Sequence, residues 1–147
     1  MRLPIALVLA VAAIPSAVAA ADWKEVDRLT GDVAVELDQG SVSKVLDGAN
    51  EVLQATFRRQ MPTGIMESDV AIDCKATAAK LRGLRLVNGD KIYNQPVSPT
   101  LEYHPVSFGS ADAIYYKALC GKDIAPPENY AAEAPPADAP AADTGSQ

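Results

Sequence analysis

The two cysteines of the chain, Cys74 and Cys120, constrain its fold more than any other feature. A bond between them would enclose a loop of about 46 residues, for which the chain-entropy model gives about 4 kcal/mol of stabilisation. Two other uses of such a pair are redox chemistry and metal binding. Redox pairs have C-x-x-C proximity, and two cysteines with one histidine, His104, do not complete a zinc site. A structural disulfide is therefore the predicted use, provided that the chain is exported.

Export is indicated by residues 1–21, which have the order of a secretory signal peptide: a basic start, a short apolar run and small residues before a cleavage point. The apolar run is too short to cross a hydrocarbon layer about 30 Å thick. No cysteine follows it, so we expect neither a lipid anchor nor a membrane span. The small residues allow the mature chain to begin at Ala20, Ala21 or Asp22. The expected location is the periplasm, the cell surface or the medium, where disulfides persist.

Residues 22–124 are expected to form one domain that is rich in β-strands. Apolar and polar residues alternate along several segments, as they do in strands with one buried face; the clearest are Val33–Leu37, Glu51–Arg59 and Ser68–Cys74. The segment from Val87 to Asp90 is the strongest hairpin signal. Ser41 and the residues after it, up to the turn at Asp47, are expected to be irregular.

One short helix is expected after the strands. Ser110 suits its N-cap and Gly121 its C′ position. Ala111, Ile114, Tyr115 and Ala118 form an apolar stripe at helical spacing. Cys120 lies at the flank of that stripe, and Cys74 ends a strand with its side chain inward. The pattern therefore predicts a helix that is bonded to a strand.

From residue 125 to residue 147 the composition changes to proline, alanine and acidic residues. Such a segment has too few bulky apolar groups to offset the entropy of ordering, so a disordered tail is predicted. It would serve as a spacer, or as a ligand for a peptide-binding partner.

The charge of the chain excludes one class of partner. There are 19 acidic and 13 basic residues, for a formal net charge of −6. No basic field is present that would attract nucleic acid, and nucleic-acid binding is not expected. Six basic residues nevertheless gather in the strands of the middle third: Arg58, Arg59, Lys80, Arg82, Arg85 and Lys91. A patch of this kind could bind an acidic protein segment or a sulfated glycan, or could simply keep an outer sheet face soluble.

The sequence carries no motif for catalysis or for a cofactor. His104 is the single histidine, and there is no G-x-S-x-G turn for a serine nucleophile and no glycine-rich phosphate loop. The pair Asp69 and Asp73 lies on one strand face and could act as general acid and base, although solvated carboxylates are the commoner explanation. We therefore expect no enzyme activity, no metal and no cofactor.

The order of these segments resembles the surface-adhesin protein E family of exported bacterial domains. The matching residues are Trp23-Lys24-Glu25-Val26, Val35–Asp38 with Ser41-Val42, Asp73-Cys74, Pro105-Val106-x-x-Gly109-Ser110 and Lys117-Ala118-x-Cys120. The resemblance implies an α+β fold: a bent antiparallel sheet of about five to six strands packed on one C-terminal helix, with the two cysteines bonded. It also implies adhesion to host extracellular-matrix proteins and a homodimer. No ligand-binding residue can be carried over, because no matched motif is a binding motif.

Three functions follow from these observations. The first is a non-catalytic exported binding module with a protein ligand from the host matrix or the envelope. The second is a periplasmic accessory protein that contacts an envelope partner, and the third is a small hydrolase or isomerase that uses outer-face carboxylates.

Overall fold

The computed structural model describes residues 20–98, 100–128 and 130. The first half of the domain contains β1 (Trp23–Leu29), β2 (Val33–Asp38), the 3-10 helix η1 (Gln39–Ser41), β3 (Ser43–Asp47) and β4 (Asn50–Met61). The second half contains β5 (Gly64–Asp73), β6 (Ala78–Asn88), β7 (Lys91–Gln95), β8 (His104–Pro105) and α1 (Ala111–Cys120).

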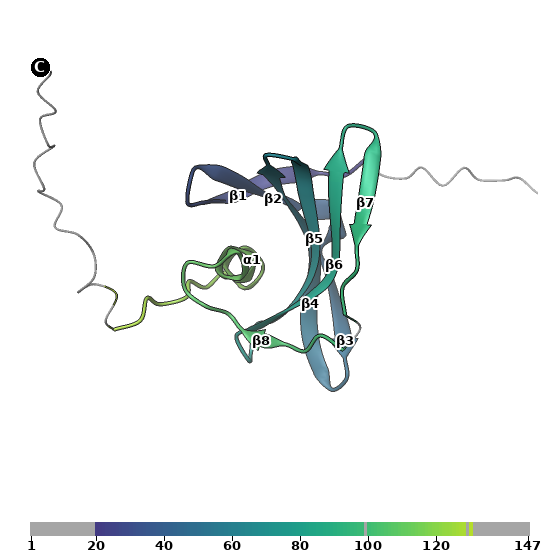
Figure 1. Ribbon diagram of the computed structural model, residues 1–147. Coiled ribbons are helices and arrows are strands. Elements are labelled where there is room, and N and C mark those ends of the chain that lie inside the picture. The colour runs from purple at the N-terminus through teal and green to yellow at the C-terminus, as the bar shows by residue number, and fades with distance from the viewer. Residues whose placement is uncertain (1–19, 99, 129, 131–147) are drawn as a thin grey trace, which may run out of the picture.

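All strand pairs are antiparallel and belong to one sheet. The main path runs β1-β2-β4-β5-β6-β7. β3 pairs with the first half of β4, and β2 pairs with its second half, so the two strands follow each other along one edge of β4. In the same way, β8 pairs with the start of β6 and β7 with its end. The sheet is strongly curved, and α1 lies on its concave side (Figure 1).

The core lies between the concave face of the sheet and α1. Alternation places Val35, Phe57 and Ile72 on this face, and all three are fully buried. The ring of Tyr115 on α1 stacks on Phe57 with the ring centroids 4.3 Å apart. Tyr116, which the expected apolar stripe omitted, is also buried. The concave face is therefore occupied by the domain's own helix, and the convex face is not.

The disulfide and the helix ends are confirmed. Cys74 and Cys120 are bonded, with their Cα atoms 5.7 Å apart. The Ser110 hydroxyl accepts a hydrogen bond from the Ala113 amide at 3.3 Å. Gly121 has the left-handed conformation that ends a helix, at φ 69°, and its amide donates to the Lys117 carbonyl at 2.9 Å.

The predicted number of strands was wrong. An antiparallel sheet with one helix is confirmed, but the structure describes 8 strands instead of five to six. The segment that was expected to be irregular contains β3, which was missed because apolar and polar residues do not alternate along it: two apolar residues, Val45 and Leu46, are adjacent, although Leu46 is 76% exposed. The helix also does not end the chain, because residues 121–147 follow it.

Two segments predicted from the sequence fall largely outside the described residues. The signal peptide is one, since the description begins at residue 20, and most of the segment from 125 to 147 is the other. Of that segment, Tyr130 is described with its ring edge-on to Phe108, at 4.9 Å between centroids. Within the described part of the chain, no helix has the length and apolar character needed to cross a membrane.

Candidate functional site

The convex face of the sheet carries the polar side chains of the central strands. Because successive residues of a strand point to opposite faces, Gln54, Asp69 and Lys80 lie opposite the buried core residues of β4, β5 and β6. Among the described residues, α1 is the single α-helix, and it covers the other face (Figure 1). The convex face is therefore the face of the sheet that α1 does not cover.

A β-bulge in β6 brings Arg82 onto this surface. Asp69 pairs with Gly83 and the next residue, Val70, pairs with Leu81, so that Arg82 is the extra residue of β6. A bulge redirects the side chain of the extra residue, and bulges are frequent near functional sites. A Cβ at the neighbouring Gly83 would lie 2.8 Å from Asp69 Oδ2, so a larger residue there would displace the Asp69 carboxylate. Arg82 is exposed as a result.

Three adjoining hollows around Arg82 form a surface that we call the convex trough. The first has a volume of 480 Å³ and is lined by Leu46, Asp47, Gln54, Lys80, Leu81, Arg82, Val97 and Ser98. The second, of 320 Å³, shares Gln54 and Arg82 with the first and adds Ser41, Ser43, Ala55, Asp69 and Val70. The third, of 140 Å³, shares Asp69 with the second and adds Gly83, Leu84, Arg85, Asn94 and Gln95.

The carboxylates of the convex trough already have partners within the domain. Asp69 accepts a hydrogen bond from the Thr56 hydroxyl at 2.7 Å and lies 3.6 Å from a guanidinium nitrogen of Arg85. Asp47 accepts the hydroxyl proton of Tyr103 at 2.9 Å. Lys80 and Arg82, by contrast, form no ion pair within the described residues. The two basic groups therefore remain available to an anionic ligand.

Tyr103 supports the first hollow from the segment that precedes β8. Lys80 Nζ lies 5.4 Å from the centre of its ring, within the range of a cation–π contact. Burial raises the pKa of Tyr103 to about 12, with smaller contributions from the hydrogen bond to Asp47 and from the charge of that carboxylate. The phenol is therefore neutral at physiological pH and holds Asp47 by a single donated hydrogen bond.

The basic residues singled out in the sequence do not all meet on this surface. Lys80, Arg82 and Arg85 line the convex trough. Arg85 is bonded to Glu67, and this hydrogen bond is the largest cause of the raised pKa of its guanidinium. Lys91 is the first residue of β7, and it does not line the third hollow, to which β7 contributes Asn94 and Gln95.

Arg58 and Arg59 lie elsewhere. Arg58 forms an ion pair with Glu36, with Nε and Oε2 2.7 Å apart. It also stacks on Trp23, with its guanidinium carbon 4.3 Å from the ring centre. Arg59 is the next residue of β4 and therefore points to the concave face, where its Nη2 contacts the sulfur of Met66 at 3.4 Å. Neither residue contributes a free charge to the convex trough.

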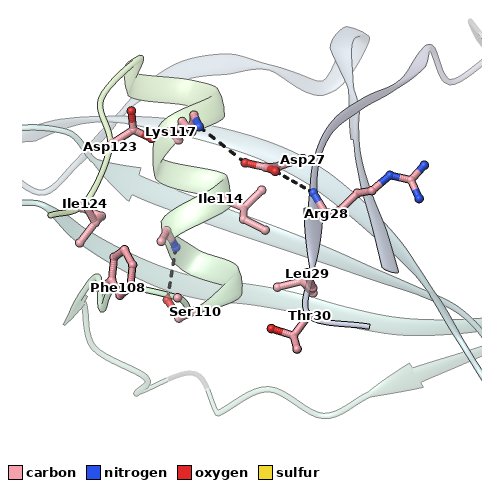
Figure 2. Close-up of a pocket in the computed structure, with 12 residues that line it drawn as sticks. Asp27, Arg28, Leu29, Thr30, Phe108, Ser110, Ile114, Lys117, Asp123 and Ile124 are labelled. Atoms are coloured by element: carbon pink, nitrogen blue, oxygen red, sulfur yellow. Dashed lines mark hydrogen bonds and ion pairs between the residues drawn. The ribbon is translucent and has the colours of Figure 1, made fainter. Parts of the chain in front are cut away.

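A separate hollow, of 230 Å³, lies outside the convex trough, between β1 and α1 (Figure 2). Leu29 and Ile114 give it an apolar lining, with Phe108 and Ile124 on the far side of the helix. Lys117 lies at its rim and pairs with Asp27 at 3.7 Å and Asp123 at 3.0 Å. These two carboxylates raise the pKa of Lys117, Asp123 most strongly. The ion pairs leave Lys117 without a free charge for a ligand.

The residues considered for catalysis and metal binding lie as follows. His104 Nε2 is 2.8 Å from Asp112 Oδ2, and no hydroxyl of the described residues forms a hydrogen bond with the ring. Asp73 is buried and accepts the amides of Lys75 and Ala76, each at 2.9 Å, so it shapes the turn after β5. No group of three metal-binding side chains gathers in the part of the chain that the structure describes.

Sequence reasoning missed Gln54, which lines the convex trough, and Tyr103, which contacts Asp47 and Lys80 of its first hollow. They come together only when β3, β4 and the segment before β8 meet in the fold. Arg82 was singled out among the basic residues, but its place in a bulge was not predicted, although the isolated glycine at position 83 within a strand pattern is typical of a bulge.

Comparison of the chain with known protein families, with curated proteins and with solved structures finds no match in any of the three.

Proposed function

We propose that this chain is an exported, non-catalytic binding module, and that it binds an acidic segment of a protein partner in the convex trough. The observation that carries the proposal is the presence of Lys80 and Arg82 in one hollow without ion-pair partners among the described residues. The nearby carboxylates are already engaged by Thr56, Arg85 and Tyr103. An incoming carboxylate or sulfate would therefore find two free cations and little competition.

Export through a cleaved leader is part of this proposal. It is supported by the residue pattern of the first 21 positions and by the disulfide, since such bonds persist outside the reducing cytosol. The resemblance to surface-adhesin protein E extends the proposal to ligands of the extracellular matrix. An envelope protein is the second class of partner, and its ligand segment would have the same acidic chemistry.

Charge reversal in the convex trough tests the proposal. We expect the double variant Lys80→Glu and Arg82→Glu to lose at least about tenfold in affinity for immobilised matrix proteins or envelope extracts, because two attractions become repulsions. The measurement is the dissociation constant by surface plasmon resonance, at low and at high salt. Screening should weaken binding of the wild-type protein as the salt concentration rises.

The matched control is the double variant Lys24→Glu and Lys122→Glu. Both residues are exposed and lie outside the convex trough. Their replacement changes the net charge of the protein by the same amount as the replacement of Lys80 and Arg82. Equal loss of affinity in both double variants would assign the effect to net charge and would contradict the proposed site.

A further inference from the structure

The outer edge of β7 is an exposed strand edge. β7 ends the main strand path, and no strand of the described residues pairs with its outer side. All five of its residues are exposed; Ile92 is 62% and Tyr93 47% exposed. Such an edge presents unpaired backbone groups to any extended polypeptide that approaches it.

The opposite edge of the sheet, β1, is protected against pairing. It has an irregularity in register between Glu25 and Asp27. The Asp27 carboxylate accepts the backbone amide of the next residue, Arg28, at 2.8 Å. Bulges and charged residues are the usual means of preventing edge-to-edge association. The centre of β7 has neither, so its outer edge is open to pairing.

Two rows of apolar side chains lead to the β7 edge, one on each face of the sheet. Ile65, Val87 and Ile92 are register partners across β5, β6 and β7. Met66, Leu86 and Tyr93 form the equivalent row on the other face. A strand added beside β7 would extend both rows with its own alternating side chains.

The turn before β7 determines which backbone groups point outward. Gly89 has φ 59° and leads a two-residue loop that is closed by the pair Asn88 and Lys91. In a hairpin of this type the closing pair is hydrogen-bonded, and bonded and non-bonded pairs then alternate. The N–H and C=O groups of Ile92 and Asn94 therefore face away from β6.

The charged groups near this edge favour an acidic segment as the added strand. Asn94 and Gln95 line the third hollow of the convex trough, which adjoins the hollow of Arg82 through Asp69. At the other end of β7, Lys91 forms no ion pair with any described residue. We propose that the acidic partner binds as an extended strand added to the outer edge of β7. This inference rests on the proposed function and adds the mode of binding.

A synthetic peptide of sequence EVTVTVE, blocked at both ends, is a suitable probe because it combines strand-forming residues with acidic ends. Amide hydrogen exchange and chemical shifts are recorded by NMR on the protein, alone and with the peptide at millimolar concentration. We expect slower exchange at the amides of Ile92 and Asn94, as these groups gain hydrogen-bond partners. The peptide EPTPTPE is the control, because its three prolines lack the backbone N–H groups that would donate hydrogen bonds along one edge.

The variant Asn94→Pro removes one outward amide without removing a bond to β6, and it should weaken peptide binding by about tenfold. Asn94→Thr keeps that amide and should bind as the wild-type protein does.

Each alternative result has a distinct meaning. If the shifts move around Arg82 while the amides of Ile92 and Asn94 exchange as before, strand addition is wrong and the proposed function stands. If neither region responds to the peptide, both proposals fail. If the amides of Ile92 and Asn94 exchange more slowly as the concentration of the free protein rises, a second copy of the chain pairs with the β7 edge. That result would overturn the inference.

Discussion

Tyr103 shows how a single side chain joins distant parts of the convex face. Its hydroxyl bonds Asp47 of β3, and its ring lies below the ammonium group of Lys80 of β6. The residue comes from a segment without regular structure, so these two contacts hold that segment against the sheet. The first hollow of the convex trough depends on this arrangement.

The raised pKa of Tyr103 predicts a specific alkaline behaviour. The unfolded phenol ionises near pH 10, and the folded one near pH 12. The folded state therefore favours the neutral phenol, and this contribution is complete below pH 10 and is lost as the pH rises toward 12. We expect Tyr103→Phe to lose less free energy of unfolding than the wild-type protein over this interval, as measured by urea unfolding. The same loss in both proteins would contradict the assignment.

At the scale of elements, α1 is held to the sheet by packing and by one covalent bond. The helix has 10 residues, which is too short to be stable alone. Its inward residues Tyr115 and Tyr116 pack on the concave face, and the bond from Cys120 to Cys74 fixes its last turn.

Replacing both cysteines with serine is therefore expected to cost about 2–5 kcal/mol of unfolding free energy. Amides of α1 should then exchange faster than those of β4 and β5. Unchanged stability in urea, or free thiols in the oxidised wild-type protein, would contradict the structural role of the bond.

The long central strands and the helix could be predicted from sequence, because each has a regular apolar period and clear end signals such as Ser110, Gly121 and the turn at Gly89. β3 could not, since its exposed positions hold Lys44 and the apolar Leu46, while its half-buried positions hold Val45 and the charged Asp47, so polarity does not follow burial. The sequence also could not show which of the basic residues lie together on one face of the sheet. Arg58 and Arg59 are neighbours on opposite faces, and whether a charge is free depends on partners far along the chain, such as Glu36.

At the scale of the whole molecule, the two faces of the sheet differ in the side chains that they carry. The concave face contains the core and the helix, and it provides the stability of the domain (Figure 1). The convex face has polar hollows, two free basic groups and an adjoining open edge at β7. In the proposed function, this division lets the domain bind a partner on one face without exposing the core on the other.

Acetylation of lysines in the native cell envelope tests the central claim most directly. The protein is labelled with an amine-reactive ester either in the intact envelope or after purification, and each site is quantified by mass spectrometry. We expect Lys80 to be several times less reactive in the envelope than in the purified protein, because the partner covers the convex trough. Exposed Lys24 and Lys122 should react equally in both preparations. Equal labelling of Lys80 in the envelope and in the purified protein would contradict binding through this surface.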